Sequence, residues 1–216
     1  MLMVIKAKEN IKWLLDNHCI LIIGILYTIT AFVVVGSAWI ENIYHYDLNL
    51  TISIYVALRP WTAVLYGIVA IIMTAMGIRY INNCVTHKGK RFVYYIVFIC
   101  ILGCAVCPCN SEWSMVMFKL HNLFAIGLML MVLISFGLGL MEARFSVQRI
   151  VSIVSICYAI FFIVSYLVLR LKFFTMTLFI WENAFIYLLL TNLYFEMLDL
   201  TKSSKNSPTS RSENVI

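Results

Sequence analysis

The sequence predicts an all-α integral membrane protein built as a bundle of six transmembrane helices. Three observations support this prediction. Hydrophobic residues make up 63% of the 216-residue chain, and the mean hydropathy is +0.95. Charged residues make up only 12%, about half of the fraction typical of a soluble domain. Six apolar stretches each approach the length of about 20 residues that a helix needs to cross the hydrocarbon core.

We expect one membrane domain, residues 18–200, between two short flanking segments. Residues 1–17 combine three lysines and Trp13 with apolar side chains, a pattern typical of a helix lying in the membrane interface. Residues 201–216 are rich in Ser, Lys and Asn and are expected to form a disordered cytosolic tail. The first apolar stretch is too long for the core of a cleaved signal peptide, so we expect it to remain as a span.

The first three spans are separated by two different loops. We expect span one over about 18–40, followed by a polar and aromatic loop over 41–59. Span two, about 60–81, opens with a proline, which suits the first turn of a helix. A basic loop over 82–91 then leads into span three, about 92–107, which is short for a crossing.

The last three spans follow with shorter connections. We expect span four over about 115–141, span five over 149–169, a tight turn at 170–172 and span six over 173–197. Small residues in spans two and four permit close contact between helices in lipid. The residues expected to pack in this way are Ala63, Gly67, Ala70, Thr74, Gly127, Ser135, Gly137 and Gly139.

The distribution of Lys and Arg predicts that both termini lie in the cytosol. With that orientation, 12 of the 16 Lys and Arg residues lie inside, as the positive-inside rule requires. The four outer ones are Arg59, Lys119, Arg170 and Lys172. The sequon at Asn49 lies in the first outer loop and predicts N-glycosylation in a secretory membrane. The net charge of +6 is explained by topology and anionic lipid, so we expect no nucleic-acid partner.

Two polar sites interrupt otherwise apolar spans. Glu182, followed by Asn183, is expected roughly 13 Å below the start of span six. A carboxylate there must be protonated, paired or facing a wet cavity. His121 and Asn122 are expected roughly 9 Å down span four, at a similar depth, with Arg59 as a third member of the site. These five residues are candidates for contacting a lipid head group or sharing a proton; the alternative is that each only bonds two helices together.

Three cysteines form a Cys-x-x-Cys-Pro-Cys cluster at the outer end of span three. Cys104, Cys107 and Cys109 are candidates for a structural disulfide, for inert thiols or for a redox pair. A zinc site would need a second pair of ligands nearby, which the sequence lacks. Phosphate-binding, zinc-protease and serine-hydrolase motifs are also missing, so we expect no metal or cofactor, and whether the chain is an enzyme stays open.

Four features together carry a family resemblance. One is the plan of six spans, cytosolic termini and a short tail. The others are an Ile-Ser element before span two, a His-Asn motif opening span four, and acidic residues at both ends of span six. In this chain they are Asn49–Ser53 with Pro60, Lys119–Ala125, and Glu182 with Leu190–Asn192 and Glu196.

With these features the chain resembles a six-span family over roughly residues 18–200. The family includes the damage-regulated autophagy modulators (DRAM), the Sfk proteins and the Golgi factor that remodels GPI-anchor lipids. The chain departs from its pattern at Asn183, where the family has an aromatic residue, and near Ser53, where a glycine is missing.

The resemblance implies lipid-related work, and it brings no agreed catalytic mechanism. Its branches are linked to GPI-anchor lipid remodelling, phospholipid distribution, autophagy and the modulation of other membrane proteins. The first hypothesis is therefore a multi-pass protein of an endomembrane (ER, Golgi or lysosome) or the plasma membrane that engages lipid at a polar site in the outer half of the bundle. The second is a non-catalytic accessory subunit of a larger membrane protein. A third is a membrane enzyme acting on acyl chains or thiols.

Overall fold

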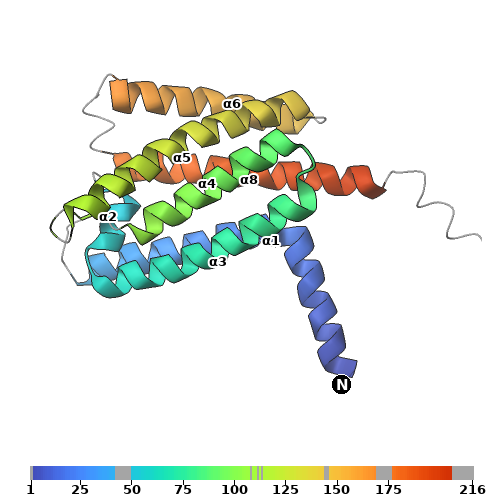
Figure 1. The fold of residues 1–216 in the computed structure, drawn as a ribbon, viewed down its shortest axis with the longest axis horizontal. Helices are drawn as coiled ribbons and strands as arrows, with labels where there is room; N and C mark the ends of the chain where they lie inside the picture. The colour runs from blue at the N-terminus through green and yellow to red at the C-terminus, as the bar shows by residue number, and fades with distance from the viewer. Residues whose placement is uncertain are drawn as a thin grey trace, which may run out of the picture.

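The chain folds as a bundle of long helices (Figure 1). The computed structural model describes residues 2–41, 50–107, 109–110, 112, 114–143, 146–168 and 177–205, of which 2–17, 146, 167–168 and 199–205 are described by their backbone alone. In chain order the helices are α1 (Leu2–Ile40), α2 (Ile52–Ala57), α3 (Pro60–Cys84), α4 (Lys88–Val106), α5 (Met115–Glu142), α6 (Ser146–Ile163), the π-helical turn η1 (Val164–Val168) and α8 (Leu178–Lys205). The sequon residue Asn49, Arg170 and Lys172 lie outside the described residues.

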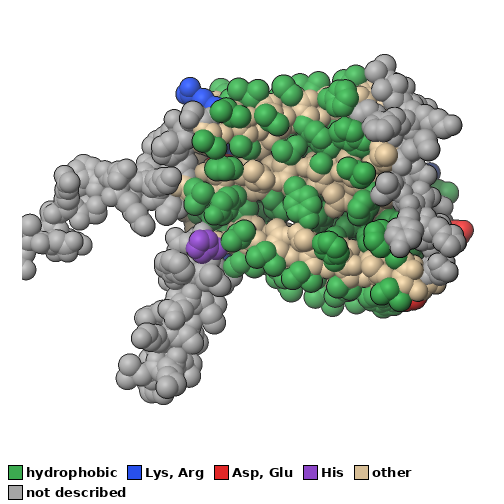
Figure 2. Space-filling model, turned by 180° about the vertical axis from the view of Figure 1, so that it is seen from behind, with side chains coloured by type: hydrophobic (Ala, Val, Ile, Leu, Met, Phe, Trp, Pro, Cys, Tyr) green, Lys and Arg blue, Asp and Glu red, His purple; other side chains and the backbone are tan. Residues whose placement is uncertain are grey.

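Among the described residues, six helices are long and apolar enough to cross a membrane, which confirms the predicted fold class. The spans are His18–Ile40, Pro60–Cys84, Lys88–Val106, Met115–Glu142, Val147–Tyr166 and Leu178–Leu198. Figure 2 shows hydrophobic side chains covering the middle of one whole face, with charged side chains only toward its ends. The chain is therefore a multi-pass membrane protein, while the side on which its termini lie stays a prediction.

Helix α1 consists of two segments joined at His18. This residue has non-helical backbone angles, φ −134° and ψ 16°. The segment before it, residues 2–17, is helical and points away from the bundle (Figure 1). The expected lead-in segment is thus a helix, and its placement in the membrane interface stays a prediction.

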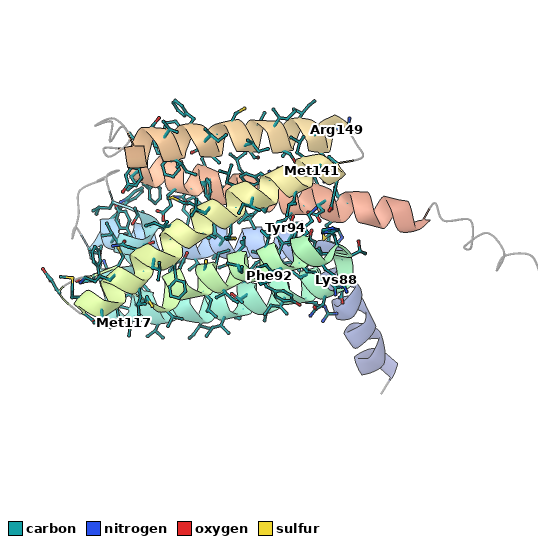
Figure 3. The ribbon with its side chains drawn as sticks, turned by 45° about the horizontal axis from the view of Figure 1, so that its top comes forward. Lys88, Phe92, Tyr94, Met117, Met141 and Arg149 are labelled. Atoms are coloured by element: carbon teal, nitrogen blue, oxygen red, sulfur yellow. The ribbon has the colours of Figure 1, made fainter. Side chains whose placement is uncertain are left out.

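The six spans close into a ring. Going round it, α1 packs on α3, α3 on α4, α4 on α5, α5 on α6, α6 on α8, and α8 on α1. The short helix α2 lies at one end, against α1, α3 and α8. We call this the α2 end and the opposite one, where α4 begins, the Lys90 end. Figure 3 places Met117 at the α2 end and Lys88, Met141 and Arg149 at the Lys90 end.

The predicted basic loop is mostly helix. α3 continues to Cys84, and α4 begins at Lys88 rather than near residue 92. His87 caps α4, because its ring Nδ1 accepts from the Lys90 backbone N–H at 3.4 Å, so one of the helix's first N–H groups finds a partner. The connection between the two spans is therefore only residues 85–87.

The loop expected over 41–59 contains the helix α2. Thr51 caps it, since its hydroxyl oxygen accepts from the Ile54 N–H at 3.2 Å. Ile52, Tyr55 and Val56 bury their side chains in the core. A six-residue helix is far too short to be stable alone, so tertiary contacts hold it.

Close helix contacts depend on glycines, but only partly on those expected. A Cβ added to Gly77 would overlap the Phe98 ring, and one added to Gly103 would overlap the Phe124 ring. Helix α4 therefore approaches α3 and α5 closely at Gly77 and Gly103, which are not among the small residues expected to pack.

The expected glycines divide into two pairs. A Cβ on Gly127 would lie 3.3 Å from Cys100 Sγ, and one on Gly139 would lie 3.5 Å from Ser152 Oγ, so both face a neighbouring helix. A Cβ on Gly67 or Gly137 would meet nothing within 4 Å. The expected packing role is wrong for these last two, because their faces of the helices point away from other spans.

Candidate functional site

A narrow cavity runs inside the ring of helices. It has a volume of about 100 Å³, and residues of all six spans and of α2 line it. Along α8 its lining extends from Glu182 to Leu193, roughly 16 Å at 1.5 Å per residue. A cavity of this volume and length is a narrow tube.

The cavity is polar toward the α2 end and apolar along the rest of its length. The polar lining residues are Tyr27, Ser53, Tyr66, Cys104, His121 and Glu182. Hydrocarbon side chains line the part toward the Lys90 end, among them Ile23, Met73, Phe98, Leu128, Leu189 and Leu193. A wall of this kind suits an amphiphile whose polar part lies at the α2 end.

Glu182 lies at the polar end of the cavity and holds the start of α2. Its Oε2 accepts from the Ile52 N–H at 2.8 Å, and its Oε1 accepts from the Ser53 hydroxyl at 3.5 Å. The first N–H groups of a helix have no partner inside it, and the helix dipole favours a negative charge there. The carboxylate is thus stabilised by the backbone of α2.

Glu182 lies nearer to the start of its helix than predicted. α8 begins at Leu178 rather than at residue 173, so Glu182 is only about 6 Å from that start instead of roughly 13 Å. Its depth in the membrane stays a prediction. His121, six residues into α5, lies roughly 9 Å from the start of that helix, so both groups lie near the α2 end.

His121 is buried and bonds to the end of α4. Its Nδ1 lies 2.8 Å from the Cys107 carbonyl oxygen and 3.0 Å from that of Cys104. Because carbonyl oxygens only accept, Nδ1 carries the proton, and Nε2 is the remaining acceptor of the neutral ring. His121 and Glu182 line one cavity, yet each bonds to backbone groups, and no contact among the described residues joins the two.

Arg59 lies off the cavity and ties the start of α3 to the end of α1. It is only 8% exposed. Its Nη1 donates to Ser37 Oγ at 3.0 Å, and its Nη2 donates to the Ser37 carbonyl at 3.2 Å. Its Nε lies 3.1 Å from Glu41 Oε2 in an ion pair. These contacts give Arg59 a structural position away from the other candidates.

The two predicted asparagines also lie off the cavity. Asn183 Oδ1 accepts from the Tyr27 hydroxyl at 2.8 Å, and its Nδ2 donates to the Phe179 carbonyl at 2.8 Å, so it joins α8 to α1. Asn122 is exposed on α5, next to the buried His121. A turn of about 100° per residue separates neighbouring side chains on a helix, which explains why His121 faces inward and Asn122 does not.

The three clustered cysteines are free thiols in the structure. Cys104 lines the cavity, Cys107 is buried at the end of α4, and Cys109 is half-buried. Burial, with a smaller contribution from the charge of Glu182, raises the pKa of Cys109 to about 11. Because the thiolate is the reactive form, this environment disfavours thiol chemistry at neutral pH. No cluster of three or more potential metal ligands occurs in the described part of the chain.

A second polar cluster, centred on Lys90, lies at the opposite end. Lys90 is 1% exposed, and its Nζ lies 2.8 Å from Glu196 Oε1 and 2.9 Å from Glu142 Oε2. The Tyr94 hydroxyl donates to Glu196 Oε2 at 2.5 Å. The cluster joins α4, α5 and α8, and we assign it to the stability of the bundle.

We expected Lys90 to lie in the basic loop over 82–91, so the sequence did not place it beside Glu196. The four-residue spacing of Lys90 and Tyr94 puts both on one helix face, and this was the available signal. Asn192, four residues before Glu196, bonds to α6: its Oδ1 accepts from Ser152 Oγ at 3.0 Å, and its Nδ2 donates to Ser155 Oγ at 2.6 Å.

Comparison with known proteins adds no relative. No family model, no curated protein and no solved structure matches the chain. The resemblance to the DRAM and Sfk family therefore stays a prediction.

Proposed function

We propose that this chain binds a membrane lipid, holding one acyl chain in the internal cavity with the lipid's polar part at the α2 end. The observation that carries the proposal is the uneven lining of the cavity, polar at one end and hydrocarbon along the rest. A tail in the apolar part would gain dispersion contacts that an empty void lacks. Glu182, His121 Nε2 and the Ser53 and Tyr66 hydroxyls would meet its polar part.

The depth of the polar end supports this assignment. Glu182 and His121 lie roughly 6 and 9 Å from the starts of their helices. Head groups and the ester region occupy the outer several ångströms on each side of the ~30 Å hydrocarbon core. The polar end of the cavity therefore corresponds in depth to the polar part of a lipid, and the apolar part to its tail.

Lipid handling, such as phospholipid or GPI-anchor lipid remodelling or distribution, is the wider function we propose. It agrees with what the family resemblance implies. The geometry favours holding a lipid over cleaving it, because the α2 backbone engages Glu182 and no contact in the described part of the chain joins it to His121, whose Nε2 is the remaining acceptor. Acid–base catalysis needs its donor and acceptor groups aligned on the reacting atoms.

The test compares two neighbouring substitutions on α5. Ala125 lines the cavity, whereas Ile126 is exposed on the outer face. The full chain is purified in mild detergent, and native mass spectrometry measures bound lipid in the wild type, Ala125→Phe and Ile126→Phe. Ala125→Phe should lose most of the bound lipid, because its ring fills the tube. Ile126→Phe should keep it.

Two results would contradict the proposal. One is equal lipid retention in both variants, with both folded as judged by gel filtration. The other is a wild type that carries no lipid. A stoichiometric protein partner found in its place would favour the accessory-subunit function.

A further inference from the structure

A groove opens between α1 and α8 on the outside of the ring. It has a volume of about 420 Å³. Figure 2 views the bundle from the side on which these two helices lie, where the surface is apolar. The groove residues are Ile20, Leu21, Gly24, Ile25, Thr28 and Ile29 of α1, and Tyr187, Leu190, Thr191 and Tyr194 of α8. All lie within the membrane spans, so hydrocarbon faces the groove.

Only one layer of side chains separates this groove from the internal cavity. Leu190 lines both. Beside it, Tyr27 lines the cavity and Tyr187 lines the groove, and their rings meet edge to face at 5.7 Å. The partition is therefore Leu190 and this ring pair.

Contacts hold α1 and α8 together on either side of Leu190. Toward the α2 end, the Tyr27 hydroxyl donates to Asn183 at 2.8 Å, and the Thr28 and Tyr187 hydroxyls share a hydrogen bond at 2.9 Å. Toward the Lys90 end, Cys19 Sγ lies 3.9 Å from Met197 Sδ. Between these contacts α1 carries Gly24, and even a Cβ there would lie 3.7 Å from Leu190 Cδ1. The glycine leaves Leu190 uncovered on the groove side.

We propose that the α1–α8 groove is the lateral entrance through which an acyl chain of a bilayer lipid passes between the membrane and the cavity, with Leu190 as the barrier. This inference rests on the proposed lipid-binding function. The groove meets the cavity where Leu190 and Leu193 make the wall apolar, so a tail, and not a head group, crosses there. A leucine side chain changes rotamer rapidly, which allows an acyl chain to pass while α1 and α8 stay in contact on both sides of Leu190.

The experiment measures exchange separately from binding. The full chain with its co-purified lipid is placed in vesicles of phosphatidylcholine with deuterated acyl chains, and native mass spectrometry follows the replacement of bound lipid. Gly24→Leu fills the groove from a position that does not line the cavity. Gly67→Leu is the matched control, because a Cβ added there would meet nothing within 4 Å. Leu190→Ala removes the barrier.

If the groove is the entrance, lipid exchange in Gly24→Leu should be slower by at least about tenfold. A small rise in the height of the barrier produces such a change in rate. The final amount of bound lipid should be unchanged. Gly67→Leu should match the wild type, and Leu190→Ala should exchange faster. If Gly24→Leu does not fold, Thr191→Trp fills the same groove from α8.

The outcomes separate the two proposals. Wild-type exchange rates in a folded, groove-filled variant would overturn the entrance and leave lipid binding standing. A dimer that Gly24→Leu breaks without any change in exchange would show that a second copy covers the groove, and would also overturn the entrance. A wild type with no bound lipid would overturn both proposals.

Discussion

At the scale of single residues, three buried ionisable groups, Lys90, Glu182 and His121, each have a polar partner within 3 Å. Lys90 is fully buried, but two carboxylates flank it. Glu182 and His121 each complete the backbone of a helix end. Leaving a polar group unsatisfied costs several kcal/mol inside a membrane, so removing one partner should have a measurable effect on stability.

Lys90→Met should lower the free energy of unfolding by about 3–5 kcal/mol, because it leaves Glu196 buried without its cation. The double variant Lys90→Met/Glu196→Gln should recover much of that loss. Lys88, two residues away and exposed, provides the control: Lys88→Met should stay close to the wild type. Denaturant unfolding in detergent measures the free energy of unfolding of all three variants. An unchanged free energy of unfolding in Lys90→Met would show that the cluster contributes no stability.

Cys109 should react slowly with alkylating reagents at neutral pH. Its pKa is raised from 9.0 to about 11, so its thiolate fraction at pH 7 should be about a hundredfold below that of an ordinary cysteine. Its alkylation rate, followed by peptide mass spectrometry, should climb until the pH passes about 11 and should rise on unfolding. Rapid alkylation of the folded chain at pH 7 would instead support the thiol-oxidoreductase hypothesis.

At the scale of elements, the long spans were predictable and the short pieces were not. Length and hydropathy define a membrane helix locally, so the span boundaries expected near 18, 40, 60, 115 and 141 agree with the structure to within one residue. α2 was not predicted, because six residues are too few to show a helical periodicity and because the helix is stabilised by Glu182 of the distant helix α8. The contacts at Gly77 and Gly103 were not predicted, because they depend on which aromatic ring of the neighbouring helix lies opposite each glycine.

The glycine contacts lead to a prediction about helix packing. Gly77→Ala and Gly103→Ala should each destabilise the bundle by about 1–3 kcal/mol, because the new methyl overlaps a phenyl ring in a packed interface. Gly67→Ala, in open space, should be neutral or slightly stabilising. Thermal unfolding in detergent ranks the three, and equal melting temperatures would contradict the described packing.

The bond between Glu182 and α2 leads to a second prediction at this scale. Glu182→Ala should leave the Ile52 N–H without its acceptor, a local loss of about 1–3 kcal/mol. Hydrogen exchange should then speed up over residues 52–57, while Glu182→Gln, which keeps an acceptor oxygen, should stay close to the wild type. Unchanged exchange in the alanine variant would mean that other contacts suffice to hold α2.

At the scale of the whole molecule, function depends on how the ring closes. The sequence shows that His121 and Glu182 are unusual in apolar spans, and the structure places both along one cavity. The sequence could not show that Arg59 and Asn122 lie away from the cavity, because the rotation of each helix about its axis is set by its neighbours. The cavity and the groove likewise belong to no single segment, since each is formed by faces of helices far apart in the chain.

The most direct test of the account is photocrosslinking with a phospholipid that carries a photoreactive group at the end of one acyl chain. A lipid tail in the cavity should label residues of its apolar part, such as Leu189 and Leu193, whose side chains are buried. This labelling should be lost in Ala125→Phe, whose ring fills the cavity, and kept in Ile126→Phe. Labelling confined to outward-facing residues such as Ile126 and Ile180 would contradict the claim that a lipid tail occupies the cavity.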